Sequence, residues 1–261
     1  MAKLMGVVNV TPDSFSDGGL YLDPETAIAH GRELAEAGAE ILDVGGESTR
    51  PGADPVDAEE ELRRVVPVIR GLRDADCEIS VDTSKAPVAD AALEAGATIV
   101  NDVTALRGDS GMAVLCAERG TTVVLMHMLG EPRTMQDDPR YEDVVSEVKA
   151  FLGERLEAAV AAGIAEENVW LDPGIGFGKT PAHNMELLRR LGELRELGRP
   201  LVIGTSRKSF IGKVDGSGPG ERLGGTIASS VLAAAEGAEV LRVHDVSEVR
   251  QALAVTAAIL G

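Results

Sequence analysis

Aromatic residues are scarce in this 261-residue chain, where they make up 3% of the sequence as four Phe, two Tyr and one Trp. The chain is nevertheless 44% hydrophobic, so Ala, Val, Ile and Leu must fill its interior. These residues suit a parallel sheet buried on both faces, because its strands are nearly continuous aliphatic runs. We therefore expect a large aliphatic core built around such a sheet.

Cysteines and long apolar runs are also lacking. The two cysteines, Cys77 and Cys116, match no metal-binding spacing and imply no disulfide framework. No apolar run is long enough to span a bilayer, and Met1 leads into the first strand without a signal peptide. We therefore expect two reduced thiols in a cytoplasmic protein.

Positive charge is the third shortage. The chain has 43 acidic and 25 basic residues, a net charge of −18, and only six of the basic residues are lysines. An acidic surface repels polyanions, which argues against nucleic acid or an anionic membrane as a partner. Solubility, a saline source and a GC-rich source remain open as explanations of the acidity.

The chain contains eight apolar runs of the β type, and each ends in a polar residue or a polar segment. They end at Asn9, Asp43, Asp82, Asp102, His127, Asp172, Gly204 and His244. A strand that only packs in the core is not expected to end in a polar residue, because desolvating an unpaired polar group costs about 2–7 kcal/mol. The strand ends are therefore expected to converge on a ligand, as they do at the carboxyl face of a TIM barrel.

We accordingly predict a single-domain (β/α)₈ TIM barrel over residues 1–261. Helical patterns separate the strands, at about 25–37, 57–74, 85–95, 110–119, 142–162, 183–196, 221–236 and 246–260. The alternative is an open doubly wound sheet, which the absence of a Gly-x-Gly-x-x-Gly fingerprint disfavours.

Five long loops follow strands of the predicted barrel, at residues 11–23, 45–56, 128–141, 173–182 and 205–219. Long loops in a compact domain are more often functional than idle. The first two contain Phe15 and Arg50, which favours a lid that closes over the substrate. The alternative is that both are mere connections.

Asp82, Asn101 and Asp172 end the third, fourth and sixth strands. Two carboxylates and a carboxamide suit a planar heterocycle with an amidine-like N–H edge, because a carboxylate can accept two parallel N–H bonds. Helix capping by Asp82, general acid–base chemistry, or a metal held with Asn9 are the alternatives.

Arg242 and His244 lie two residues apart on the eighth strand, on one face, and Lys208 follows the seventh. Barrels often bind phosphate with the loops after strands seven and eight, so these cations are candidates for an anion site. A salt bridge to Asp245 is the alternative role.

These segments together resemble those of the dihydropteroate synthase family over essentially the whole chain. The matching segments are residues 5–19 (MGVVNVTPDSFSDGG), 43–52 (DVGGESTRPG), 80–83 (SVDT), 101–102 (ND), 125–128 (LMHM), 132 with 134–136, 171–180 (LDPGIGFGKT), 206–212 (SRKSFIG) and 242–245 (RVHD). The differences lie elsewhere, in Arg133, in residues 213–220 and in the acidic surface.

The resemblance implies condensation of 6-hydroxymethyl-7,8-dihydropterin diphosphate with 4-aminobenzoate, a step of folate biosynthesis that sulfonamides target. It implies a pterin site of Asp82, Asn101, Met126, Asp172 and Lys208. It implies a diphosphate site of Asn9, Arg242 and His244, with Mg²⁺ held partly through Asn9. The implied 4-aminobenzoate site comprises Phe15, Thr49, Arg50, Pro51, Phe177, Lys208 and Ser209. Lys208, Arg242, His244 and Asp82 are the expected catalytic residues.

Two other functions remain as alternatives, a corrinoid-linked methyltetrahydrofolate methyltransferase on the same barrel and a pterin-binding protein without catalysis. We also expect a homodimer. Residues 226–235 are small and apolar, and residues 253–260 are apolar almost all round, whereas helices that ring a barrel should carry a polar outer face.

Overall fold

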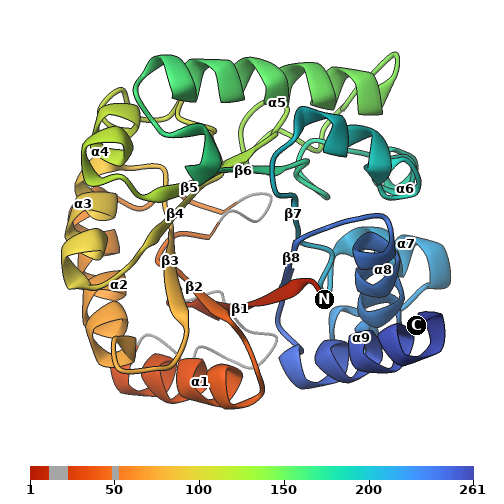
Figure 1. Cartoon of the computed structure of the whole chain (residues 1–261), viewed down its shortest axis with the longest axis horizontal. Coiled ribbons are helices and arrows are strands. Elements are labelled where there is room, and N and C mark those ends of the chain that lie inside the picture. The colour runs from red at the N-terminus through yellow and green to blue at the C-terminus, as the bar shows by residue number, and fades with distance from the viewer. Residues whose placement is uncertain (12–22, 49–52) are drawn as a thin grey trace.

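A computed structural model describes residues 1–11, 23–48 and 53–261 of the chain. Eight parallel strands curl into a barrel, with helices around it (Figure 1). The strands are β1 (Lys3–Asn9), β2 (Ile41–Gly45), β3 (Glu78–Asp82), β4 (Ile99–Asp102), β5 (Thr122–Met126), β6 (Val169–Asp172), β7 (Val202–Ile203) and β8 (Val240–Val243). Their order is β6-β5-β4-β3-β2-β1-β8-β7, and a bridge between Leu171 and Leu201 joins the two edges. The expected (β/α)₈ barrel is confirmed.

The helices of the described chain follow the strands in the expected alternation. They are α1 (Pro24–Glu36), α2 (Ala58–Leu72), α3 (Ala86–Ala95), α4 (Met112–Arg119), α5 (Val144–Ala161), α6 (Pro181–Arg189), α7 (Ser209–Asp215), α8 (Leu223–Ala235) and α9 (Val246–Leu260). Three 3₁₀ helices also occur, η1 (Glu166–Asn168), η2 (Leu191–Leu197) and η3 (Pro219–Glu221). Side chains of Asp23, Asp57 and Asp143 cap three of the helices by accepting backbone N–H bonds.

Two helical predictions were wrong in detail. Residues 183–196 form not one helix but α6 followed by η2, and the break falls at Arg190, whose φ is −112°. The second error is α7, which lies within a segment that we expected to be a loop. A seven-residue helix is shorter than the window over which hydrophobic periodicity can be read.

The interior of the barrel is filled by an apolar plug. It consists of Met5, Ile41, Ile99, Val124, Val202 and Val240, with Trp170 packed against it. Successive side chains of a strand point to opposite faces, so the residue two positions further along also faces inward. These next residues include Asp43, Asn101 and Arg242, which we call the polar layer. The plug therefore forms the floor of the site, and the polar layer lies directly above it.

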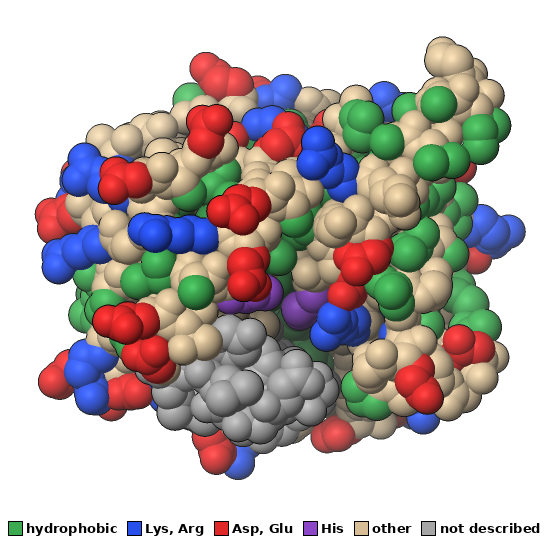
Figure 2. All heavy atoms as spheres, turned by 90° about the horizontal axis from the view of Figure 1, so that it is seen from below, with side chains coloured by type: hydrophobic (Ala, Val, Ile, Leu, Met, Phe, Trp, Pro, Cys, Tyr) green, Lys and Arg blue, Asp and Glu red, His purple; other side chains and the backbone are tan. Residues whose placement is uncertain are grey.

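The second and larger apolar cluster lies between the strands and the surrounding helices. It includes Leu42, Val44, Val81, Val100, Leu171 and Leu241, all of them almost fully buried. Both faces of each strand are thus covered, which explains why aliphatic side chains suffice without many rings. Acidic and basic side chains are interspersed over the face shown in Figure 2. Among the described helices, none has the length and apolar character needed to cross a membrane.

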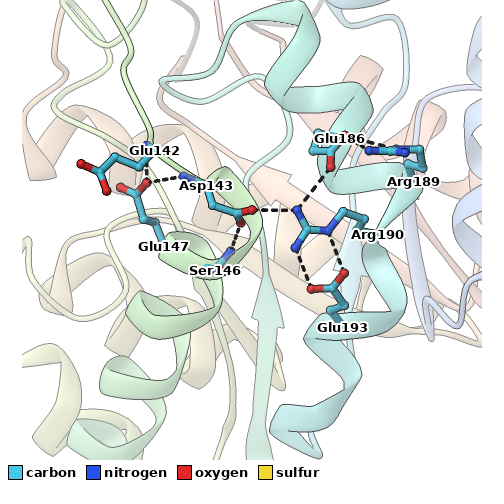
Figure 3. A network of polar contacts seen from close by, with 8 residues as sticks. All are labelled: Glu142, Asp143, Ser146, Glu147, Glu186, Arg189, Arg190 and Glu193. Carbon is cyan, nitrogen blue, oxygen red and sulfur yellow. Dashed lines mark hydrogen bonds and ion pairs between the residues drawn. The ribbon is translucent and has the colours of Figure 1, made fainter.

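Arg190 links α5, α6 and η2 at the surface (Figure 3). Its guanidinium lies 2.9 Å from Asp143, 3.3 Å from Glu186 and 2.7 Å from Glu193. The side chain is about a quarter exposed, so these ion pairs contribute less than buried ones would. The network explains how several acidic residues are tolerated where the helical path bends.

Another ion-pair cluster joins α2 to the start of α3 around one buried carboxylate. Lys85 Nζ lies 2.5 Å from both Glu61 Oε2 and Glu47 Oε2, and the Glu61 side chain is completely buried. We predict that Lys85→Met lowers the free energy of unfolding by about 3 kcal/mol, because Glu61 would keep a buried charge without its cation.

Urea denaturation of the purified variant measures this change. Lys3→Met is the matched control, because Lys3 pairs with Glu78 at the surface and each side chain is nearly half exposed. Its loss should cost less than about 1 kcal/mol. Equal losses in the two variants would contradict a special role for the cluster around Lys85.

Candidate active site

The polar layer is held together by the guanidinium of Arg242. Its Nε donates to Asp43 Oδ2 at 2.6 Å, and its Nη2 donates to Asp82 Oδ2 at 2.9 Å. Asn101 Nδ2 donates to the same Asp43 oxygen at 3.2 Å. Four strands, β2, β3, β4 and β8, thus contribute to one cluster at the carboxyl face of the barrel. Three residues expected in the site, Asp82, Asn101 and Arg242, are brought together there.

The cluster strongly perturbs its ionisable groups. Burial raises the pKa of Asp82 to about 7, and nearby Asp43 adds to the rise while Arg242 opposes it. Burial works against the charged form of Arg242, but Asp43 and Asp82 outweigh it and raise the guanidinium pKa. One cation faces two buried carboxylates, so the Asp82 carboxylate readily takes up a proton near neutral pH.

Asp172 and Lys208 form the other side of the site. Asp172 Oδ1 accepts from the backbone N–H of Gly174 at 2.7 Å. Lys208 Nζ donates to the carbonyl oxygen of Ile175 and lies 4.8 Å from the centre of the Phe177 ring. Burial raises the pKa of Asp172, which Lys208 opposes, and burial lowers the pKa of Lys208 to about 8, which Asp172 opposes. Each charge therefore keeps the other ionised.

An apolar cluster lies beside these charges. It contains Val103, Met126, Met128 and Met135, with the half-buried Phe177 packed against it. Met126 belongs to this cluster, and its expected contact with the pterin remains a prediction. Ser209 is the first residue of α7 and is exposed. Phe15, Thr49, Arg50 and Pro51 lie outside the described residues, so their expected roles and the lid remain predictions.

His244 is positioned by Ser206. The Ser206 hydroxyl oxygen accepts from the His244 backbone N–H at 3.1 Å and lies 3.0 Å from its ring Nδ1.

Asp245, considered in the sequence analysis as a salt-bridge partner for Arg242, instead pairs with Arg207 at 3.0 Å. Arg242 is in a salt bridge after all, but with Asp43 and Asp82, and its expected role in anion binding remains a prediction.

Sequence reasoning missed three residues of this region. Asp43 was recognised as a strand end but not as a site residue, although it is completely buried and binds both Arg242 and Asn101. Lys179 and His127 were within matching segments, and both are nearly inaccessible. A lysine within a matching segment that follows a strand end, in a chain with only six lysines, was a signal that could have identified Lys179.

The oxygen atoms around Gly45 fit the expected Mg²⁺ site. A Cβ atom at Gly45 would lie 3.6 Å from Asp82 Oδ2 and 3.8 Å from Asn9 Oδ1, so both oxygens face the same small space. Mg²⁺ prefers hard oxygen ligands and usually takes only one or two from protein, with water and phosphate supplying the rest. Among residues 1–11, 23–48 and 53–261, no group of three His, Cys, Asp or Glu side chains could form a metal cage. The Mg²⁺ site at Asn9 remains a prediction.

The fold and the site define a class of enzyme. The family model described as "Pterin binding enzyme" matches residues 5–244. The dihydropteroate synthase of Escherichia coli K12 is 48% identical over 259 residues, which cover 99% of this chain and 92% of that enzyme.

Solved structures agree. The Yersinia pestis dihydropteroate synthase with a sulfonamide drug has a TM-score of 0.96 and 45% identity, with 99% of this chain and 94% of that one covered. The Xanthomonas albilineans enzyme in complex with 7,8-dihydropteroate has a TM-score of 0.89 and 46% identity, with 100% and 94% covered. The chain belongs to the dihydropteroate synthase family, a group of transferases in folate biosynthesis, and the resemblance seen in its sequence is confirmed.

Asp82 should leave a signature in the pH dependence of stability. Its folded pKa of about 7 lies above its ordinary value, so between about pH 4 and pH 7 the folded state keeps a proton that the unfolded state has lost. This group therefore makes stability fall as pH rises through that window, by up to about 1.4 kcal/mol per pH unit.

We predict that Asp82→Asn removes this component. Urea denaturation from about pH 4 to pH 7 should give a stability curve that rises more, or falls less, with pH than the wild-type curve. Parallel curves for the two proteins would mean that Asp82 ionises at its ordinary pKa.

Proposed function

We propose that this chain condenses 6-hydroxymethyl-7,8-dihydropterin diphosphate with 4-aminobenzoate to give 7,8-dihydropteroate and diphosphate. The observation that carries this proposal is the convergence of Asp172, Lys208 and the polar layer at the carboxyl face of a barrel of the dihydropteroate synthase family. The product named in the Xanthomonas complex and the sulfonamide named in the Yersinia complex support the same substrates.

The pterin would lie between Asp172 and Asn101. The Asp172 carboxylate is oriented by Gly174 and can accept from the 2-amino and N3 groups of the ring, which form an amidine-like donor edge. Asn101 is fixed by Asp43 and can hydrogen-bond the ring from β4, with Asp82 beside it. Met126 and its apolar neighbours would pack against the flat face of the ring.

The diphosphate would lie against Arg242, His244 and Asn9. Arg242 already points its guanidinium into the mouth of the barrel, and His244 is oriented by Ser206. Bound Mg²⁺ would supply a Lewis acid that lowers the energy of the departing diphosphate, with Asn9 as its ligand from the protein. These assignments follow the family resemblance and the observed placement of the three side chains.

The chemistry needs electrostatic support more than it needs a nucleophile. The bond between the methylene carbon and the diphosphate oxygen breaks, the amine nitrogen of 4-aminobenzoate bonds to that carbon, and the amine loses a proton. The electron-rich ring can delocalise positive charge at the methylene group before the amine attacks. Arg242 and His244 would neutralise the leaving group, and Lys208 lies beside Phe177 where 4-aminobenzoate is expected.

The decisive assay measures diphosphate release with and without 4-aminobenzoate and identifies the product by its mass. The proposal requires that release depend on both substrates and that the product contain both rings. A methyltransferase would release no diphosphate under either condition. A pterin-binding protein without catalysis would bind the pterin but form no product.

We predict that Asp172→Asn lowers kcat/KM by roughly 30- to 1,000-fold, equivalent to about 2–4 kcal/mol, because a donor would replace one acceptor at the pterin edge. Steady-state kinetics measure the change, and circular dichroism shows whether the fold is retained. Asp138→Asn is the control, because Asp138 is exposed and pairs only with surface Arg140 among its described contacts. Wild-type kcat/KM in the Asp172 variant would remove this residue from the pterin site.

We also propose a homodimer that forms through α8 and α9. These helices lie side by side on one flank of the barrel (Figure 1). They expose large apolar side chains, with Leu232 at 45%, Val255 at 54%, Ile259 at 76% and Leu260 at 74% exposure. Large apolar side chains exposed on neighbouring helices favour an interface at this flank.

The cytoplasmic location remains a prediction, supported by two free thiols at Cys77 and Cys116.

We predict that light scattering at micromolar concentration gives the mass of a dimer and that Ile259→Glu gives a monomer, because a buried charge without a partner opposes association. Val114→Glu on α4 is the matched control, because Val114 is 54% exposed on another helix and its change should leave the dimer intact. A monomeric wild-type protein would contradict the proposed interface.

A further inference from the structure

Lys179 is a buried lysine that the proposed mechanism does not use. It belongs to the loop between β6 and α6, and it is only 2% exposed. Burying an ammonium group is costly unless its protons are bound, so such a residue is kept for a reason. The same loop contains Asp172 at its start and Phe177 near its middle, which brings Lys179 close to both proposed substrates.

The Lys179 ammonium makes three contacts, all to neutral atoms. It donates to the Phe177 carbonyl oxygen at 2.9 Å, lies 2.9 Å from His127 Nδ1 and lies 3.5 Å from the His127 carbonyl oxygen. Burial lowers the pKa of His127 to about 3, and Lys179 lowers it further. The His127 ring is therefore neutral, and its Nδ1 accepts a hydrogen bond from the Lys179 ammonium.

These contacts tie the loop to the end of β5. His127 directly follows β5, and its backbone N–H donates to the Asp172 carbonyl oxygen at 2.9 Å. The loop approaches the residue after β5 so closely that Gly174 cannot be replaced by a larger residue, since a Cβ at Gly174 would lie 1.9 Å from the His127 carbonyl oxygen. Gln136 and Tyr141 hold the outer side of the loop by donating to the carbonyl oxygens of Gly176 and Gly178. Lys179 is the charged member of this set of contacts.

The charge of Lys179 also acts on Asp172. Burial raises the pKa of the Asp172 carboxyl, and Lys208, Arg242 and Lys179 each oppose the rise. Conversely, burial lowers the pKa of Lys179 to about 7, Asp172 opposes this and Lys208 adds to it. Below about pH 7 the ammonium is therefore charged, in the range where Asp172 most needs support to stay ionised.

We propose that Lys179 is a positioning residue for the substrate pocket, which locks the β6–α6 loop against the end of β5 through His127 and Phe177 and supports the Asp172 carboxylate with its charge. This inference rests on the proposed role of Asp172 as the acceptor for the pterin edge. It assigns Lys179 no contact with substrate. The proposed role has two parts, hydrogen bonding to the loop and stabilisation of the ionised Asp172 by the ammonium charge. The two parts predict different responses to substitution of Lys179.

Other ionisable groups lie near Lys179 and Asp172, and every variant of Lys179 retains them. His183 on α6 faces Lys179, and both burial and Lys179 lower its pKa. Arg107, which follows β4, acts on His127, and Lys208 titrates at about 8. Substituting Lys179 also removes its effect on the pKa of His183 and His127, so the comparison with the wild type at the same pH includes these secondary changes.

The test is calorimetric titration with 6-hydroxymethyl-7,8-dihydropterin, a pterin without diphosphate, at about pH 6 and about pH 8.5. Lys179→Gln keeps a hydrogen-bond donor and removes the charge. It should bind the pterin more weakly than the wild type at the lower pH, because without this charge Asp172 takes up a proton more readily, and within about twofold of the wild type at the higher pH. Lys213→Gln removes an exposed lysine and should match the wild type at both.

Lys179→Met removes the donor as well as the charge. It should repeat the pH-dependent loss and, in addition, raise the KM for 4-aminobenzoate by about threefold to tenfold, because the Phe177 carbonyl loses its donor and the loop loosens. Lys179→Gln should raise that KM less. Circular dichroism and thermal melting of both variants show whether the fold is retained.

Three results would overturn the inference. Equal loss of pterin affinity at both pH values would mean that Lys179 only holds the loop, and no loss would mean that it supports neither the loop nor Asp172. Unfolding of both variants would assign Lys179 to the core rather than to the site. A wild-type protein that fails to bind the pterin would instead refute the proposed function, and the inference with it.

Discussion

The guanidinium of Arg242 holds together side chains from four strands of the barrel. It lies on β8, donates to Asp43 on β2 and Asp82 on β3, and shares its Asp43 oxygen with Asn101 on β4. The cluster rests on the apolar plug, which excludes water from below. Removing one member of such a buried group leaves a charge uncompensated, at a cost of about 3–5 kcal/mol. The geometry of the site therefore depends on a balance of charges as much as on packing.

That balance bears on the proposed anion site. Two carboxylates share Arg242, so a diphosphate that binds as proposed would have to draw the guanidinium partly away from them. Since the pKa of Asp82 is already about 7, a proton can compensate this carboxylate when the guanidinium turns to the diphosphate. On the opposite side, Asp172 and Lys208 keep each other ionised, and the buried Lys179 hydrogen-bonds to Phe177 of the same loop. We propose that the cost of burying these charged groups is tolerated because the same groups serve the substrates.

Much of this arrangement could be predicted from the sequence. Polar residues at the ends of apolar runs predicted the barrel and identified Asp82, Asn101, Asp172 and Arg242, because parallel strands bring their carboxyl ends to one face. The partners of these residues could not be predicted in the same way. Arg242 binds Asp43 and Asp82 and not its neighbour Asp245, since the contact depends on inward-facing positions across the barrel and not on nearness in sequence. The short helix α7 and the break at Arg190 were missed because local periodicity is weak over so few residues.

The central claim is that Arg242, released from its carboxylates, binds the diphosphate of the substrate. Calorimetric titration of diphosphate with Mg²⁺ into the wild type and into Arg242→Met tests it most directly, with circular dichroism to check the fold. The account predicts that the variant binds diphosphate at least about a hundredfold more weakly, equivalent to about 2.7 kcal/mol. Equal affinity in the two proteins would show that Arg242 serves only to hold Asp43 and Asp82, and would contradict the account.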